Sequence, residues 1–448
     1  MGFFDRFFGK KHPPLPPPAD IPAYESPDPD ISFGHYVDAN KTAYQLDKWE
    51  EANTLFGEKK YTDSFIAFLE YAGDPAVKNI AWERQGGEIR FTLEQGSKII
   101  RGLHDGESVT AQALLAEFQQ PPIAVMRQLL AANYQLRYTK FAIEDHTFGI
   151  YFKSPAAEAS PNKLYHSLKE LALKADKNDD FLTEEFSGIS KTDRGHIVPQ
   201  DEKIGEIKYA YWLKWSEEAL AFAGNYDSHS FTGIISYTLL NLLYKTDYLL
   251  SPQGHFLDEI TRIQHIYWNK QDARPHTEKN DELVRQLKLL LMKPETYFTG
   301  SFYGVKTTFG LAPGTGAQTI SDYISDCLKN TDWYIQHKYP EMEMTVYEYT
   351  VTYCLFHYGM YPAHYRLFGL HMQILNEAYY RELGFAVPYV KDGAVDAGTV
   401  KEEIRRIVET EKAVYPNLTF PLENLKFDTP AEFHYSFLSE MRFLNFVK

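Results

Sequence analysis

The stretch IAWERQGGEIRFTLEQGSKIIRGLHDG, residues 80–106, decides the fold that we expect for this chain. In its centre, apolar residues alternate with polar ones, so that Ile89, Phe91 and Leu93 share one side of an extended segment. Such alternation is typical of an antiparallel strand with one buried face. The glycines that supply turns at the strand ends are Gly86, Gly87, Gly96 and Gly106. The stretch therefore predicts three consecutive antiparallel strands.

Further elements are predicted on both sides of these strands. A helix over residues 61–72 precedes them and ends at Gly73, with proline just beyond. A short helix capped by Ser108 or Thr110 is expected to run to Phe118, and another begins near Pro122. Two more strands follow over residues 138–143 and 147–152. A long helix then starts at Ser160-Pro161, where a capping hydroxyl precedes a proline in the first helical position.

The second half of the chain has a different composition, with 23 of the 32 tyrosines after residue 205. Its apolar periodicity is helical throughout. The helices expected there cover residues 206–223, 231–250, 254–269, 278–292, 317–335, 342–358, 363–383, 398–414 and 430–446.

The predicted fold class is therefore α+β. An N-terminal antiparallel sheet of about five strands, with helices on one face, is followed by a mainly α-helical domain. The expected parts are an aromatic segment and Pro-rich linker over 1–40, the α+β domain over 41–190, a polar linker over 191–205 and an all-helical domain over 206–448.

Composition and charge limit the classes of function. The formal net charge of −15 argues against nucleic-acid binding, which requires clustered Lys and Arg. No apolar run is long enough to predict a membrane span, and Asp5 and Arg6 interrupt the N-terminal apolar stretch that a signal peptide would need. The two cysteines, Cys327 and Cys354, are expected to be buried free thiols, with a disulfide as the alternative. We therefore expect a bacterial-type cytoplasmic protein.

The N-terminal segment carries its own signals. Phe3, Phe4, Phe7 and Phe8 pair at a spacing of four and share one side of a short helix. We expect a packed or frayed terminal helix, with peripheral docking on a membrane surface or partner as the alternative. The proline-rich stretch that follows, residues 13–29, is interpreted as an extended spacer.

The order of elements from Tyr61 to Phe186 resembles that of the type III secretion chaperone-like (Tir chaperone) family. The segment from Val125 through Leu130 to Tyr138 is similar in character as well. The resemblance implies a small α+β fold, often dimeric, that binds extended segments of client proteins through sheet and helix surfaces without a nucleotide. It covers under a third of the chain. It brings no catalytic residue, and the helical half is absent from the small chaperones.

Two groups of residues resemble metal-binding motifs, but their spacing argues against metal binding. The segment from Asp176 to Asp180 opens like a calcium loop, but Phe181 occupies the position that needs glycine. His357, His364 and His371 recur every seven residues, about 10.5 Å apart along a helix, which is too far to share one metal ion.

Other residues admit more than one interpretation. The group Asp227, His229 and Ser230 is interpreted as a turn and helix cap. A tyrosine-rich stretch is interpreted as packing between helices, with a recognition groove as the alternative; it comprises Tyr347, Tyr349, Tyr353, Tyr358, Tyr361 and Tyr365. No cofactor and no metal is predicted.

The glycine-rich loop Gly310-Leu-Ala-Pro-Gly314-Thr-Gly316 precedes a predicted helix, so that its backbone amides are candidates for holding an anion. It lacks the Lys-Ser/Thr ending of a phosphate-binding loop, and a flexible connection is the alternative. The residues that we expect to contact a protein or peptide partner are Phe91, Ile150, Leu168 and Leu171.

The leading functional hypothesis is a non-enzymatic protein-binding module that holds a partner polypeptide by strand addition or groove docking. A homodimer is compatible with this hypothesis. Two rivals remain open. One is an enzyme with a pocket in the helical domain near residues 310–316, and the other is a purely structural protein whose two domains stabilise each other.

Overall fold

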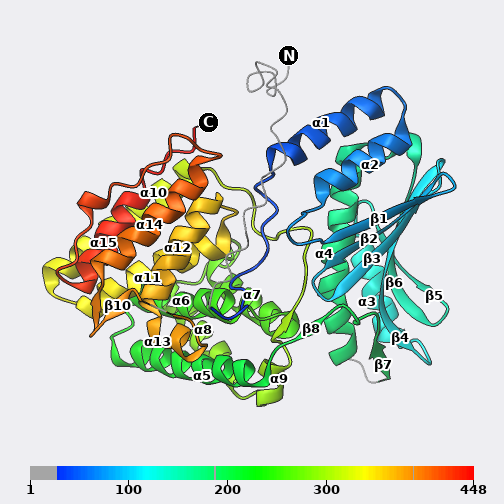
Figure 1. Cartoon of the computed structure of the whole chain (residues 1–448). Coiled ribbons are helices and arrows are strands. Elements are labelled where there is room, and N and C mark those ends of the chain that lie inside the picture. The colour runs from blue at the N-terminus through cyan, green and yellow to red at the C-terminus, as the bar shows by residue number, and fades with distance from the viewer. Residues whose placement is uncertain (1–27, 186–187, 387, 448) are drawn as a thin grey trace.

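The computed structural model describes residues 28–185, 188–386 and 388–447, and Figure 1 shows two parts side by side. The predictions for the Phe-rich segment and for most of the proline-rich stretch fall outside these residues, as does the side chain of Phe181. The first part is an antiparallel sheet with helices, and the second is a mainly helical region. This arrangement confirms the predicted fold class.

The sheet has seven strands, which is more than the five expected. The six main strands lie in the order β1-β2-β3-β4-β6-β5, and β7 pairs with the far end of β4. Their bounds are β1 Ile80–Gln85, β2 Glu88–Gln95, β3 Lys98–His104, β4 Ser108–Phe118, β5 Lys140–Glu144, β6 Thr147–Pro155 and β7 Ile189–Lys191. All of the pairs are antiparallel.

The turns that join the strands follow the sequence signals. Gly86 and Gly87 both have positive φ, 60° and 97°, as a tight two-residue hairpin turn requires. The connection between β5 and β6 uses Asp145 and His146, again with positive φ at both residues. The start of the long helix was also predicted correctly, since α4 begins at Pro161 and Ser160 Oγ accepts a hydrogen bond from Lys163 N.

One predicted element is wrong. Residues 108–118 were expected to form a short helix from Ser108 or Thr110 to Phe118, and they form β4, an eleven-residue strand at the centre of the sheet. Val109, Ala111 and Ala113 face the core in alternation, but Ala and Leu also favour helices, and the sheet on both sides overrides that preference. A bulge between Leu114 and Ala116 then brings Leu115 and Ala116 inward together.

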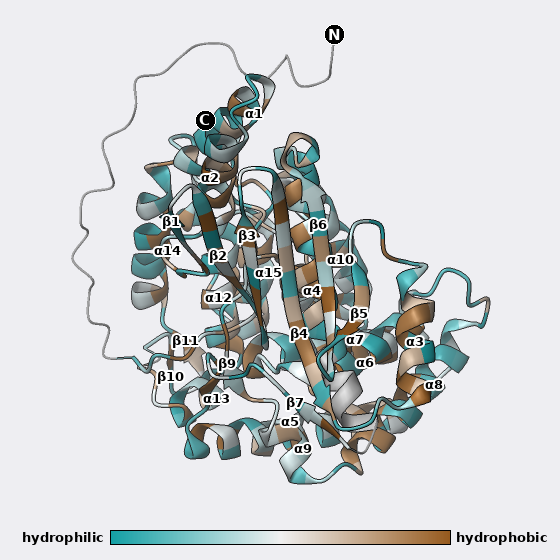
Figure 2. Ribbon diagram, turned by 90° about the vertical axis from the view of Figure 1, so that its right-hand side faces the viewer, coloured by the Kyte–Doolittle hydropathy of each residue, from teal (hydrophilic) through white to brown (hydrophobic). Residues whose placement is uncertain are grey.

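Helices cover one face of the sheet and leave the other open. The helices of this part are α1 Ala43–Gly57, α2 Tyr61–Ala72, α3 Ile123–Asn133 and α4 Pro161–Glu185. Helix α4 packs across β2, β3, β4 and β6 on one side and contacts α7 of the helical region on the other. Figure 2 looks onto the open face, with the strands in front and the helices behind them.

The helical region matches the expected positions closely. Its helices are α5 Glu202–Asn225, α6 Thr232–Leu250, α7 Gly254–Trp268, α8 His276–Leu291, α9 Glu295–Thr299, α10 Ala317–His337, α11 Pro340–His357, α12 Pro362–Leu375, α13 Glu377–Glu382, α14 Ala397–Lys412 and α15 Pro430–Met441. The helix expected over 363–383 is divided at Asn376. Two short strand pairs were not expected: β8 Val198–Pro199 with β9 Tyr303–Gly304, and β10 Val390–Lys391 with β11 Ala394–Val395.

An interdomain arm, residues 305–310, joins the two parts. Its Phe309 is 1% exposed and belongs to the core between the sheet and its helices, where it packs edge-on against Tyr165. The Gln95 side chain accepts from Phe309 N at 3.0 Å and donates to Phe309 O at 3.2 Å, as a neighbouring strand would. Gly96 N also donates to Lys306 O at 3.0 Å. The helical region therefore contributes a residue to the core of the sheet domain.

A strap, residues 28–42, runs between the two parts, and Figure 1 shows it in dark blue. Its Gly34 N donates to Tyr248 O at 2.8 Å in the helical region. A few residues further on, Asp38 accepts from the Tyr165 hydroxyl at 3.1 Å and lies 3.6 Å from Lys169, both on α4. The strap therefore contacts both parts along its length.

We predict that Phe309→Ala destabilises the sheet domain, because it removes a buried aromatic side chain that the domain's own residues cannot replace. The expected cost is about 3–5 kcal/mol. Urea denaturation followed by circular dichroism measures it. Leu311→Ala is the matched control, since Leu311 lies two residues away and is 68% exposed. Equal midpoints for the two variants would contradict the role of the arm.

Candidate functional site

The four residues predicted to contact a partner lie in the interior. Phe91 and Ile150 point from β2 and β6 toward the helices, and Leu168 and Leu171 point from α4 toward the sheet. Each is at most 2% exposed. In the folded chain they are core residues, packed between the sheet and its helices.

The glycine-rich loop packs against the strap. Gly310 is buried, and a Cβ there would lie 2.9 Å from Asp38 Oδ1, so the Asp38 carboxylate lies close to the first glycine of the loop. Gly314 pairs with Gly359, and Gly316 precedes α10. The neighbouring Asp38 makes this loop unfavourable for an anion, since like charges repel.

The open face of the sheet has a hollow of about 700 Å³ over β3, β4, β6 and β5. The strand register places Arg101, Gln112, Tyr151 and Lys140 in one row across the four strands. A second row contains Leu103, Thr110 and Lys153. The hollow therefore has a largely polar floor with cations near its ends.

The first part of the β5 edge, at Thr139 and Phe141, is capped by side chains. Its outward backbone groups belong to alternate residues, and Asn133 on α3 binds both groups of Phe141: Phe141 N donates to Asn133 Oδ1 at 2.7 Å, and Asn133 Nδ2 donates to Phe141 O at 3.1 Å. Just before the strand, Glu170 on α4 accepts from Thr139 N at 3.0 Å. These contacts occupy groups that another strand would otherwise bind.

The β1 edge is not capped in this way. Glu94 N donates to Asn79 O, so Asn79 is a residue whose backbone groups face β2. In an antiparallel pair, residues that face the partner strand alternate with residues that face away from it. Ile80, Trp82 and Arg84 therefore direct their N–H and C=O groups outward. Within the part of the chain that the structure describes, these outward groups have no hydrogen-bond partner. Residues 81–85 are all exposed. The two edges of the sheet therefore differ in their capacity to accept a strand.

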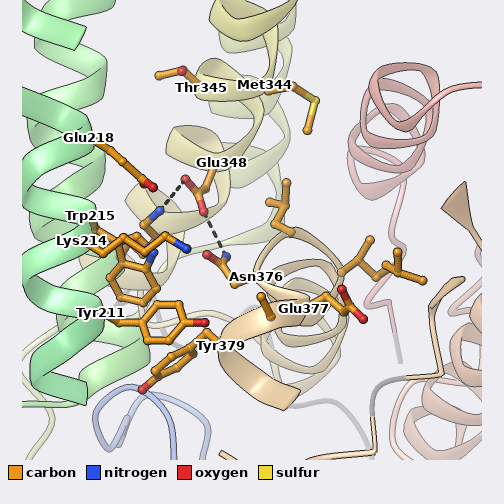
Figure 3. A pocket seen from close by; sticks show the side chains of 15 residues that line it. Tyr211, Lys214, Trp215, Glu218, Met344, Thr345, Glu348, Asn376, Glu377 and Tyr379 are labelled. Atoms are coloured by element: carbon orange, nitrogen blue, oxygen red, sulfur yellow. Dashed lines mark hydrogen bonds and ion pairs between the residues drawn. The ribbon is translucent and has the colours of Figure 1, made fainter. Parts of the chain in front are cut away.

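A pocket of about 470 Å³ lies in the helical region, between α5, α6, α11 and α13 (Figure 3). At its base Glu348 accepts from Lys245 Nζ at 3.2 Å, from Asn241 Nδ2 at 2.6 Å and from Asn376 Nδ2 at 3.0 Å. Lys245 also lies 4.7 Å above the centre of the Trp215 ring. This group was not found from the sequence, because its residues come from separate helices and follow no motif.

The electrostatics of this pocket explain why the carboxylate stays charged. Burial alone would raise the pKa of Glu348, but the Lys245 charge and the hydrogen bonds from Asn241 and Asn376 outweigh it and lower the pKa. Both carboxylate oxygens already accept hydrogen bonds. The group is therefore a satisfied ion pair that joins α6, α11 and the break between α12 and α13.

The three evenly spaced histidines lie in different surroundings. His357 Nε2 lies 3.1 Å from the Tyr244 hydroxyl, whereas His371 Nε2 lies 2.9 Å from Nδ1 of His434 on α15. His364 is buried, and its Nδ1 has no hydrogen-bond partner among the residues that the structure describes. Across residues 28–447, apart from those left undescribed, no group of three or more His, Cys, Asp or Glu side chains is placed to hold a metal ion.

The remaining clusters have structural roles. Asp227 accepts from Ser230 N at 2.6 Å before α6, and Asp176 accepts from Ser97 N at 2.7 Å in the β2–β3 connection. Tyrosines of the tyrosine-rich stretch pack between helices: the Tyr349 ring stacks on Tyr237 at 4.4 Å and the Tyr353 ring on Tyr323 at 4.1 Å. Both cysteines are buried free thiols.

Comparison with models of known protein families gives no match, and comparison with curated protein sequences gives none either. Among the helices that the structure describes, none combines the length and apolar character needed to cross a membrane.

We predict that Glu348→Gln destabilises the helical region by about 3 kcal/mol or more, because Lys245 then keeps a largely buried charge without a carboxylate. Thermal and urea unfolding measure the change. Glu218→Gln is the control, since Glu218 lines the same pocket but is exposed. Equal losses of unfolding free energy in the two variants would contradict a stabilising role of the ion pair.

We also predict that stability falls with acid because of the buried histidines. Burial lowers the pKa of His364 to about 3, and the unfolded chain binds the same proton near pH 6.5. Between these values the unfolded state holds more protons, so the free energy of unfolding decreases as the pH falls. His364→Gln should reduce this slope between pH 6 and pH 4.5 by up to about 1.4 kcal/mol per pH unit.

Urea titrations at several pH values test this prediction. Measurement of the same variant at pH 8, where histidine is neutral in both states, separates any loss of packing from the proton effect. An unchanged slope would contradict the prediction.

Proposed function

We propose that this chain is a non-enzymatic polypeptide-binding protein that receives an extended segment along the β1 edge of its sheet. The observation that carries the proposal is the difference between the two edges. Asn133 and Glu170 occupy backbone groups at β5, whereas the outward groups of Ile80, Trp82 and Arg84 are free among the described residues. An uncapped edge strand is a template for strand addition.

The side chains along β1 give the edge two different faces. Ile80, Trp82 and Arg84 lie on the helix-covered face, because they pair with the inward residues of β2. Trp82 is 39% exposed there, and Arg84 lies 3.8 Å from Asp63 of α2. An added strand would place alternate side chains beside Trp82, where apolar residues bury surface.

The helical region supports this function as a brace. Through Phe309 and Gln95 it fixes the β2–β3 end of the sheet, close to the start of β1, where Asn79 Nδ2 donates to Thr307 O at 3.3 Å. A fixed edge loses less conformational freedom when a partner binds, and so binds more tightly. This role combines the binding hypothesis with mutual stabilisation of the two domains.

The resemblance to the secretion chaperone-like family remains a proposal. The antiparallel sheet of this chain, with helices on one face, supports the resemblance. The long helix α4, which follows β6, supports it as well. The order of elements departs from the expected one, since four strands rather than three precede α3. We therefore rest the proposed function on the edge geometry and not on the resemblance.

We predict that Arg84→Pro abolishes peptide binding and leaves the fold intact, because it removes an outward N–H that takes no part in the ladder. The immobilised full-length chain is used to select a displayed library of random twelve-residue peptides. Selected peptides should alternate apolar and polar residues, and their affinity should fall at least about tenfold in the Pro variant.

Arg84→Thr is the matched control, since it removes the same side chain and the same contact with Asp63 but keeps the N–H. It should bind the selected peptides as the wild type does. Equal binding by Arg84→Pro, or no selection of any peptide, would reject the β1 edge as a binding site.

A further inference from the structure

A hollow lies on the open face of the sheet, whose strands face the viewer in Figure 2, and it is separate from the β1 edge. It extends over β3, β4, β6 and β5, and β1 and β5 are the opposite edges of the sheet. An inference about the hollow therefore goes beyond the proposed function, and the two can fail independently.

The charges of this hollow run against those of the whole chain. Arg101, Lys140 and Lys153 line it, with Glu144 as the acidic residue of the lining. Arg101 already binds the carboxylate of Asp193, which lies 2.7 Å from it through Nη2. Lys140 and Lys153 are exposed and have no carboxylate partner within the part of the chain that the structure describes. The hollow is thus a local cationic site on a chain with a net charge of −15.

The register sets the spacing of the two free lysines. Lys140 pairs with Tyr151, and Lys153 lies two residues further along β6 on the same face. Such diagonal neighbours have Cα atoms about 7–8 Å apart. In an extended segment, residues two apart are separated by about 6.6 Å and point to the same side. Two carboxylates in alternate positions therefore match the two ammonium groups.

We propose that this hollow binds an extended polypeptide segment that carries acidic side chains at alternate positions. Lys140 and Lys153 bind the two carboxylates. Gln112 and Thr110, in the same two rows, supply hydrogen-bonding groups to the segment between them. The net charge of −15 repels a long polyanion such as nucleic acid over its whole length, whereas a short acidic segment brings only a few charges.

The test uses the full chain and fluorescently labelled probes in an anisotropy titration at low salt. The probes are the decapeptides (Thr-Glu)₅, (Thr-Gln)₅ and (Thr-Lys)₅ and a ten-nucleotide oligothymidine. The acidic decapeptide should bind most tightly, and its affinity should fall as salt is added. The double variant Lys140→Gln/Lys153→Gln should weaken it at least about tenfold.

The matched control is Lys203→Gln/Lys288→Gln, which removes two exposed lysines of the helical region and the same total charge. It should change the affinity less than about twofold, since distant surface charges are screened. Because all four lysines are exposed, both variants should keep the wild-type thermal midpoint. The Arg84→Pro variant should bind the acidic decapeptide normally, which separates the hollow from the β1 edge.

Three results would overturn the proposal. Equal weakening by the two double variants would assign the binding to net charge. Equal binding of the acidic and neutral decapeptides would remove the role of the carboxylates. Tighter binding of the oligothymidine would show that the hollow selects a nucleic acid rather than an acidic peptide.

Discussion

The contact between the interdomain arm and the β2–β3 end of the sheet holds the two domains together. Phe309 completes the core beneath the sheet, and Gln95 binds both backbone groups of Phe309. Because one residue of the helical region is part of the core of the sheet domain, the two domains cannot separate without opening a cavity. The strap adds contacts to both domains and covers the glycine-rich loop.

This constraint also explains how the surfaces of the sheet are divided. Helix α4 lies between the sheet and α7, so the helix-covered face is buried against the rest of the molecule. The open face and the edges remain for interaction. At β5, Asn133 and Glu170 cap the backbone, and at β1 nothing comparable is present among the described residues. A partner strand can thus bind only where the backbone groups of a sheet edge have no hydrogen-bond partner within the described chain.

The sequence predicted much of this fold, and its failures have physical causes. Alternation in β2, the Gly86-Gly87 turn and the Ser160-Pro161 helix start are local signals, and local structure follows them. β4 was mistaken for a helix because its Ala and Leu residues favour helices, and its position between β3 and β6 overrides that preference. Sites that depend on distant residues were not predicted. No sequence motif indicates that Asn133 will contact Phe141, or that Lys245 will contact Glu348. Phe91 and Leu168 were chosen for their apolar character, and apolar character indicates core more often than surface.

Amide hydrogen exchange of the free chain, resolved to single residues, shows directly whether β1 is an open edge and whether β5 is capped at Phe141. We expect fast exchange at Ile80, Trp82 and Arg84 and slow exchange at Ala81, Glu83 and Phe141, whose amides are bonded to β2 or to Asn133. Protection of Trp82 and Arg84 as strong as that of Phe141 would contradict it, because these amides would then already have a partner.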